Sequence, residues 1–461
     1  MNEPIARYHP SFAETREIAL PFSLVAAGII VFFLAFSRHV LAVEFAVPII
    51  VLAGFAIISA NYRKIGPLFL RLTWPLFCVA LIGGLGALLT EDSSFQMRDL
   101  YRDLAFALVP IALLGTGIWL ATIETLVLIR VLMSAAFALA VFHLSQFALI
   151  PELLDASLED VRNVPGSSDN LVALALIIGL VRFTSHRMIF PSYFPRLVVL
   201  GVLTASLALS YSRAQLSVLA VMTLTLCGAS SRFAFRPFII VGALGVLLAP
   251  ILVLVSVDGG GDFLTKIADS LSEMAPLDYA NKEDISAKWR GYETYVVWAD
   301  FLSANIAYQI LGKGFGAVVD LGFYMPLNGE DFRYLPVFHN GYAYILLKTG
   351  LAGISLYVLF YLHLIRISRS GTRVFSREIG FNSYLLAGCA CSLALTMFAI
   401  GGIAQGVDPA IALLVGYLVG QIKLQLPLKS WQQYRSRGLV RDSGVRAVRS
   451  DGATAPTTSS D

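Results

Sequence analysis

His339-Asn-Gly-Tyr-Ala-Tyr-Ile-Leu-Leu-Lys-Thr-Gly350-Leu-Ala-Gly353 places a histidine and an asparagine directly before an apolar run, with two glycines at fixed distances beyond them. The stretch has the pattern H-N-x9-G-x-x-G. It stands where a long polar segment, 258–338, meets an apolar segment that is long enough to cross hydrocarbon, which takes about 20 residues. Histidine exchanges protons near neutral pH. The sequence therefore predicts a proton-transferring side chain at a water–lipid boundary.

The composition of the whole chain is typical of a membrane protein. Of its 461 residues, 57% are hydrophobic and 14% are charged, and the mean hydropathy is +0.73. Soluble domains are about 45–50% apolar and about 25% charged. The net charge of +3 is spread over loops, so we expect no nucleic-acid partner. All four cysteines fall in apolar runs, so the polar segment contains no disulfide.

Twelve apolar stretches predict an all-α polytopic membrane protein, because backbone polar groups in lipid must be paired within a helix. The predicted order is a cytoplasmic segment 1–17, transmembrane helices one to nine over 18–257, a large periplasmic loop 258–338, helices ten to twelve within 339–424, and a basic, disordered cytoplasmic tail 425–461. The stretches are about 18–36, 40–60, 72–90, 104–121, 126–149, 170–184, 197–211, 213–228, 237–257, 340–365, 381–402 and 408–423.

The seventh and eighth stretches are separated only by Ser210-Tyr211-Ser212-Arg213. Reading them as one helix would reverse every later loop and place the arginines between 366 and 377 outside, against the excess of Lys and Arg in cytoplasmic loops. Two helices are therefore predicted. The exported segment carries twelve acidic and six basic residues, and within it Trp289–Ala304 has the mixed pattern of a helix that lies on the membrane surface.

Two arginines in this arrangement are candidates for binding an anion. Arg213 opens the eighth stretch at the outer face, where the hydroxyls of Tyr211 and Ser212 can join it; the alternative is an arginine that reaches lipid headgroups. Arg290 precedes the surface helix, and its guanidinium fork matches phosphate geometry. The alternative for Arg290 is an ordinary ion pair with Glu293 or Asp284.

The remaining candidates surround His339, which is predicted to act as a general base toward a hydroxyl. Asn340 follows it directly, and Lys348 and Glu44 are charges within apolar stretches that can border a polar cavity. Leu311–Gly316 contains three glycines but lacks the G-x-x-x-x-G-K-[ST] pattern of a phosphate loop, so we predict a glycine turn. No cluster of metal-ligating residues is found in the sequence, and we expect neither a metal nor another cofactor.

Together these features resemble the O-antigen ligase and polymerase superfamily of bacterial envelope glycosyltransferases. The resemblance rests on the many spans, Arg213 after the seventh span, the late outer loop, and H-N-x9-G-x-x-G at the end of that loop. Asn163–Ala173 and the Leu311–Gly316 turn also resemble family features. In Arg213-Ala-Gln-Leu the leucine comes one residue earlier than expected for ligases, which bears on the branch rather than on the superfamily.

The resemblance implies that Arg213 and Arg290 hold the diphosphate of an undecaprenyl-linked glycan and that His339 lies near the acceptor hydroxyl. It also implies a metal-independent reaction at the periplasmic face of the inner membrane. The acceptor would be lipid A–core for a ligase, or a second lipid-linked glycan for a polymerase. A transporter or flippase of lipid-linked saccharide, and a scaffold subunit of an envelope-polymer complex, remain as alternatives from the residues alone.

Overall fold

The computed structural model describes the following parts of the chain: 28–31, 43–89, 96–121, 125–150, 153, 161, 164–166, 170–180, 193–210, 212–228, 285, 288–327, 330–372, 377–405 and 409–436. Within them, five helices are long and apolar enough to cross a membrane. These are α3 (Tyr62–Leu89), α4 (Met97–Leu120), α5 (Thr125–Leu149), α15 (Gly341–Thr372) and α16 (Arg377–Ile400). The chain is thus a helical membrane protein, as its composition predicts.

Five further apolar helices coincide with predicted spans. They are α2 (Val43–Ala60), α7 (Asn170–Leu180), α8 (Tyr193–Leu209), α9 (Arg213–Gly228) and α17 (Pro409–Ser436). The stretch 237–257 and most of 18–36 lie outside the described residues, as do the segment 1–17 and the residues after 436, so the count of twelve spans stays a prediction. α17 continues to Ser436, which makes the beginning of the predicted tail helical.

The break between the seventh and eighth stretches is present: α8 ends at Leu209 and α9 begins at Arg213. Near this break, Nδ1 of His143 in α5 lies 2.9 Å from the Ser206 hydroxyl in α8.

The start of the third predicted span differs from the structure, because the helix continues through a charged residue, Arg71. The span predicted from residue 72 begins at Tyr62 as α3, because Arg71 is exposed and a long arginine side chain can keep its charge outside an apolar layer.

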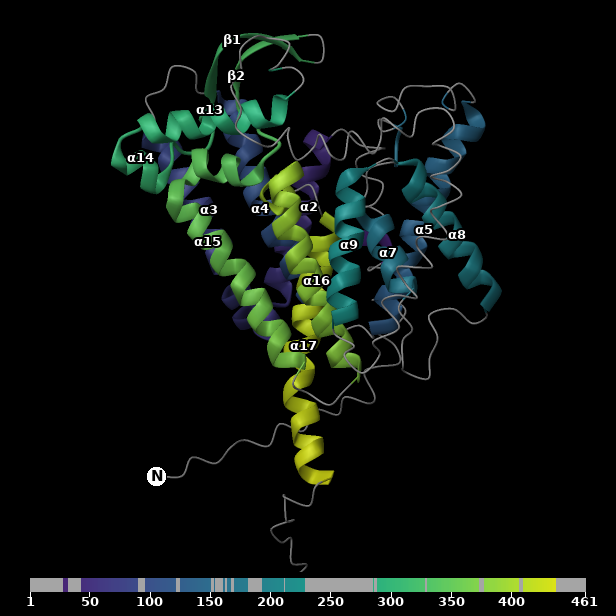
Figure 1. Ribbon diagram of the computed structural model, residues 1–461. Helices are drawn as coiled ribbons and strands as arrows, with labels where there is room; N and C mark the ends of the chain where they lie inside the picture. The colour runs from purple at the N-terminus through teal and green to yellow at the C-terminus, as the bar shows by residue number, and fades with distance from the viewer. Residues whose placement is uncertain are drawn as a thin grey trace, which may run out of the picture.

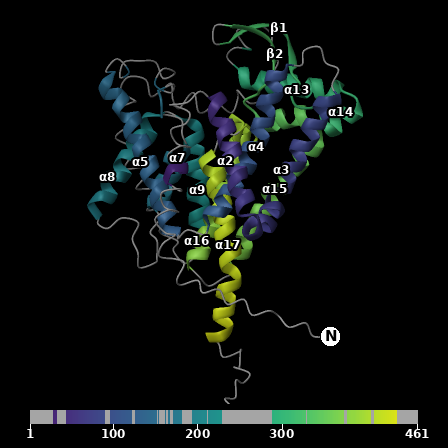
Figure 2. The same ribbon diagram turned by 180° about the vertical axis from the view of Figure 1, so that it is seen from behind.

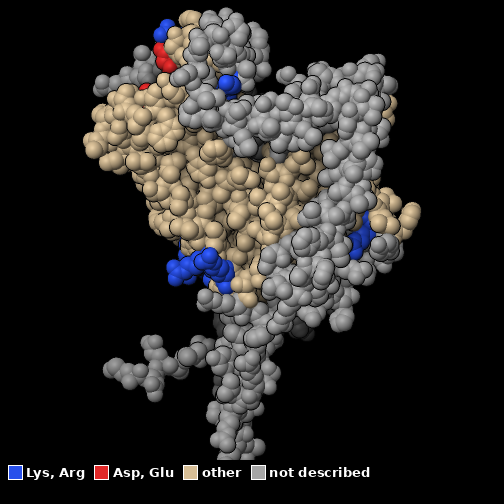
Figure 3. All heavy atoms as spheres, in the orientation of Figure 1, with Lys and Arg blue, Asp and Glu red and all other residues tan. Residues whose placement is uncertain are grey.

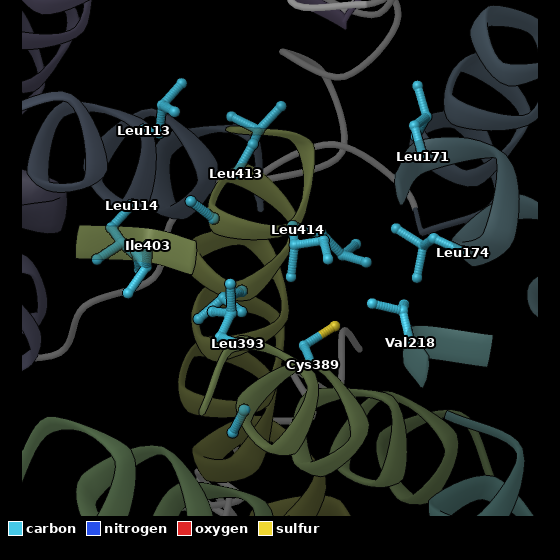
Figure 4. Packing of buried hydrophobic residues seen from close by; sticks show 14 of the residues in the cluster. Leu113, Leu114, Leu171, Leu174, Val218, Cys389, Leu393, Ile403, Leu413 and Leu414 are labelled. Carbon is cyan, nitrogen blue, oxygen red and sulfur yellow. The ribbon is translucent and has the colours of Figure 1, made fainter. Parts of the chain in front are cut away.

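The centre of the bundle is formed by α4, α16 and α17, with α7 and α9 beside them (Figures 1 and 2). Side chains from all five helices meet in the apolar core (Figure 4). Helices in lipid gain little from hydrophobic burial, so small residues that permit close backbone approach are important. A Cβ on Gly117 would lie 2.1 Å from the Leu413 carbonyl, and a Cβ on Gly416 would lie 2.1 Å from that of Leu114.

A layer of short helices and strands lies above α3, α4 and α15 at one end of the bundle (Figure 1). It contains α13 (Trp289–Ser303), α14 (Ile306–Leu311) and an antiparallel hairpin of β1 (Val319–Leu327) and β2 (Glu330–Leu335). The helix predicted for Trp289–Ala304 is confirmed as α13, whereas the hairpin was not predicted. The Tyr292 hydroxyl donates to the Leu321 carbonyl at 2.9 Å and thereby joins α13 to β1.

α15 consists of two helical segments that meet at Gly350. This glycine has φ +63° and ψ −161°, a conformation that essentially only glycine adopts. The first segment lies beneath α13, and the second crosses the bundle diagonally to its other end (Figure 1). The predicted span 340–365 agrees with the start of α15, whereas the helix continues to Thr372. At 1.5 Å per residue, the segment after Gly350 alone is about 33 Å long.

The predicted glycine turn supports this break. Gly312, Gly314 and Gly316 all have positive φ, and the N–H groups of Lys313 and Gly314 donate to the carbonyls of Leu347 and Lys348 at 2.8 and 3.0 Å. Carbonyls at the end of a helical segment have no donor within the helix. The turn supplies the missing donors and is thereby fixed against α15.

Charge is distributed unequally between the two ends. At the end of α15 distant from the hairpin, His363 interacts electrostatically with Lys423, Arg366 and Arg71. Figure 3 shows Lys and Arg gathered at that end, and a wide surface without charged side chains between it and the region of the hairpin. This pattern is that of a protein whose middle lies in hydrocarbon.

Candidate active site

A cavity of about 710 Å³ lies between α13 and the first segment of α15. Its polar lining includes Arg290, His339 and Asn340. Its apolar lining includes Trp298 and Leu302 of α13, Leu346 and Ile354 of α15, and Phe398 of α16. A cavity that joins a few polar groups to a large apolar surface is the usual form of a ligand site.

The His339 side chain lines this cavity and is half exposed. Its Nδ1 atom faces Glu293 of α13. Its Nδ1 lies 3.0 Å from Glu293 Oε2 and 3.2 Å from Oε1. Its backbone N–H donates to the same Oε2 at 3.0 Å. The Glu293 side chain is only 2% exposed, against 49% for His339, so the carboxylate is covered and the imidazole is accessible.

Asn340 begins α15 and fixes the direction in which the chain leaves His339. Its side-chain oxygen accepts hydrogen bonds from the N–H groups of Tyr342 at 3.0 Å and Ala343 at 3.3 Å. Those groups are unpaired at a helix start, and asparagine is a favoured residue for capping them. The Asn340 amide nitrogen also lies 3.5 Å from the Thr294 hydroxyl.

The residues before and after His339 are held by the segment that follows α16. Gln405, in the 3-10 helix η2 (Gly402–Gln405), donates to the Phe338 carbonyl at 2.6 Å. A Cβ on Gly341 would lie 2.6 Å from the Gly401 carbonyl, so the two backbones are in direct contact. The His339 backbone is therefore held by Glu293 on one side and by Gln405 and Gly401 on the other.

Arg290 lies in the first turn of α13, one helical turn before Glu293. The structure thus brings three predicted site residues to one cavity: Arg290, and the adjacent His339 and Asn340, which follow it by 49 and 50 residues. Glu293 was named in the sequence only as a partner of Arg290. Residues 197–358 match the family model described as O-antigen ligase.

Over these residues the chain is similar to the O-antigen ligase family. The predicted resemblance to the O-antigen ligase and polymerase superfamily is thereby confirmed, and it supports a glycosyltransferase rather than a transporter or a scaffold. Comparison with curated proteins found no match. Arg213, Arg290, Glu293 and His339 lie within the matched interval, whereas Gln405 lies outside it.

Lys348, which also lies in the matched interval, is not among the residues that line the cavity. Its side chain is fully buried, and its Nζ lies 2.6 Å from Asp103 Oδ2 of α4. It also donates to the Ala317 carbonyl, while Gly316 N–H donates to the same Asp103 oxygen at 2.8 Å. Lys348 therefore joins α4 and the glycine turn to α15, and these contacts place it in the framework of the site.

The other predicted residues are described in part. Arg213 is the first residue of α9, and Glu44 lies in α2, but the structure describes only the backbone of these two residues. Tyr211 lies outside the described residues. The Ser212 hydroxyl accepts from the Gln215 N–H at 3.4 Å, so it caps α9. Within the described residues, no group of three His, Cys, Asp or Glu side chains is placed to hold a metal ion.

Proposed function

We propose that this protein transfers a glycan from undecaprenyl diphosphate to an acceptor hydroxyl, as an O-antigen ligase or a surface-polysaccharide polymerase. The observation that carries the proposal is the lining of one cavity by a guanidinium, an imidazole and an extended apolar surface. Each of these three features corresponds to one part of the reaction: the diphosphate, the acceptor hydroxyl and the polyprenyl chain.

The apolar lining suits the polyprenyl part of the donor. Leu346 and Ile354 line the cavity on either side of the break at Gly350, and Leu351 between them also lines it and is 48% exposed on the surface. A lipid tail can therefore extend from the cavity along α15 toward the apolar middle of the protein. The break in α15 is important for this path, because side chains from both helical segments line the same cavity.

The polar lining suits the reacting groups. The Arg290 fork can bind two phosphate oxygens at once and keeps its charge at any physiological pH. In the proposed reaction the acceptor oxygen attacks the anomeric carbon, the bond from that carbon to the phosphate oxygen breaks, and undecaprenyl diphosphate leaves with the electron pair. His339 takes the hydroxyl proton. Fixed cations near the leaving oxygen lower such a barrier.

The distribution of charge supports a reaction at the periplasmic face of the bacterial inner membrane. Arg71, Arg366 and Lys423 lie together at the end of the bundle opposite the cavity. Cytoplasmic ends of membrane helices carry an excess of Lys and Arg. The cavity would then open on the other side, where Arg213 at the start of α9 and the exported polar segment are also expected.

The proposal is tested by measuring transfer with the purified full-length protein in lipid. The donor is undecaprenyl-diphosphate glycan, offered with lipid A–core in one arm and with a second lipid-linked glycan in the other. We expect wild-type protein to consume one acceptor, which distinguishes ligase from polymerase, and His339→Ala to lose about 10²–10⁴ in rate. Arg333→Ala, on the hairpin and outside the cavity lining, is the matched control. Absence of transfer to both acceptors would contradict the proposal.

A further inference from the structure

Glu293 is a buried carboxylate to which the reaction outlined above assigns no role. Its side chain is 2% exposed and does not line the cavity, so it does not contact a substrate there. Burying a carboxylate is costly unless it is paired and hydrogen-bonded. Three contacts meet this need, and all three come from His339: the backbone N–H and the Nδ1 contacts to both carboxylate oxygens.

With Glu293 as a carboxylate, these contacts select which nitrogen of the neutral imidazole carries the hydrogen. The backbone N–H can only donate, so Glu293 Oε2 is an acceptor there, and an ionised carboxylate has no proton to give. Nδ1 of neutral His339 must then carry its hydrogen and donate it to Glu293. The hydrogen bond at one ring nitrogen sets the state of the other, so the lone pair lies on Nε2.

We propose that Glu293 is a positioning residue that prepares His339 to act as the base through Nε2. The inference rests on the proposed glycosyl transfer. As the acceptor oxygen forms its bond to the anomeric carbon and the diphosphate departs with its electrons, the hydroxyl proton moves to Nε2. The resulting imidazolium carries a positive charge, and the carboxylate at 3.0 Å from Nδ1 stabilises it.

The same carboxylate sets the orientation of the ring. Because Oε2 binds both the backbone N–H and Nδ1 of one residue, the imidazole is held in a fixed rotation relative to its own backbone. Glu293 in turn is fixed by α13, which also carries Arg290 one turn earlier. The base and the diphosphate-binding arginine are therefore positioned by the same helix, and a shift of α13 would move both together.

The first test is a double-mutant cycle of Glu293→Gln and His339→Ala. The amide of Gln can still accept the backbone hydrogen bond, so folding and donor affinity are expected to stay within about twofold of wild type. The rate at saturating donor is expected to fall about 10²–10⁴-fold. In the His339→Ala background the same change should have no further effect, because residues that act as a unit are not additive. Glu293→Asp, which keeps the charge, should recover part of the rate.

A second readout does not depend on transfer. Diethylpyrocarbonate modifies the unprotonated imidazole nitrogen, and mass spectrometry measures its rate at His339 in the folded, full-length protein. In alkaline buffer, where the imidazole is unprotonated in both proteins, we expect slower modification in Glu293→Gln than in wild type, because the carboxylate no longer raises the nucleophilicity of Nε2. An unchanged transfer rate in Glu293→Gln, an equal loss in the His339→Ala background, or an unchanged modification rate would each overturn the role of Glu293. If wild type transfers to neither acceptor, the proposed function fails, and the modification rate still tests the Glu293–His339 pair.

Discussion

Lys348 Nζ and Asp103 Oδ2 lie 2.6 Å apart with both side chains fully buried, and this ion pair joins the framework of the site to α4. Removing one partner of a buried pair leaves an uncompensated charge and costs about 3–5 kcal/mol. We expect Asp103→Leu and Lys348→Met each to destabilise the protein by that amount, measured by thermal unfolding in detergent. The double variant should recover most of the loss, because apolar replacements of buried pairs are often tolerated.

The matched control is the pair of Lys313 and Asp300. Its Nζ and Oδ1 atoms lie 2.7 Å apart, close to the 2.6 Å of the buried pair, but each side chain is 27% exposed. Partly exposed pairs contribute less than about 1 kcal/mol, so Asp300→Asn should change the unfolding temperature little. A loss in Asp300→Asn as large as that in Asp103→Leu would mean that burial does not decide the strength of these pairs.

Replacing Arg290 with lysine should separate the shape of the cation from its charge. Lysine keeps the charge but presents a point donor instead of a planar fork. We expect Arg290→Lys to lose most of the transfer rate and Arg290→Ala to lose more, with removal of one such donor costing about 10²–10³. Arg333→Lys on the hairpin is the control. A nearly normal rate in Arg290→Lys would reduce this arginine to a structural role.

The break in α15 should depend on Gly350 itself. An alanine there would have to keep a φ of +63°, and its Cβ would lie 2.4 Å from the Ile310 carbonyl. Holding a non-glycine residue in such a conformation costs about 1–3 kcal/mol. We expect Gly350→Ala to be destabilised and to lose transfer activity together. Gly84→Ala, in α3 with open space around the new Cβ, should be neutral or stabilised by up to about 1 kcal/mol.

The hairpin should lose local stability in acid. The hydrogen bonds from Arg333 and then from the Gly322 N–H hold the pKa of Asp320 below its usual range. A depressed folded-state pKa contributes stability above the unfolded value of about 3.9, and the contribution is lost as pH falls through the lower folded value. Hydrogen exchange over 319–335 should therefore be faster in Asp320→Asn than in wild type at pH 7. The difference should vanish in strong acid; equal exchange at pH 7 would contradict this.

The two ends of the protein should be reached from opposite sides of the membrane. Tyr324 on the hairpin is 61% exposed, and Arg369 is exposed near the end of α15. With an impermeant maleimide, Tyr324→Cys should be labelled in intact spheroplasts and Arg369→Cys only after permeabilisation, relative to the background of the natural cysteines. The reverse pattern would place the cavity in the cytoplasm.

The helices could be predicted from the sequence because apolar runs of sufficient length have few alternatives in lipid. The ends of α3 and α15 could not, because an arginine can extend out of an apolar layer and because Gly350 is only one of many glycines in the chain. The hairpin had a local signal, since Asn328-Gly329 stands between its strands and this dipeptide favours tight turns.

The site was predictable to the extent that its residues stand out chemically. His339, Asn340 and Arg290 were identified because an imidazole at a membrane boundary and an arginine before a surface helix are unusual. Glu293 and Gln405 were not, because a single Glu in an acidic loop and a Gln beyond an apolar run carry no pattern. Their roles arise from contacts across 46 and 67 positions in the chain, which only the fold reveals.

The contacts that hold the break in α15 limit how this protein can be recombined with its relatives. The matched domain spans 197–358, yet Phe315 N–H donates to the Gly83 carbonyl, and Asp103 and Gln405 support the histidine region from either side of that interval. A chimera that exchanges 197–358 alone would inherit the histidine without the groups that orient its surroundings. Active hybrids should require compatible α3, α4 and η2. The part of the chain that must be exchanged together is therefore larger than the matched interval 197–358.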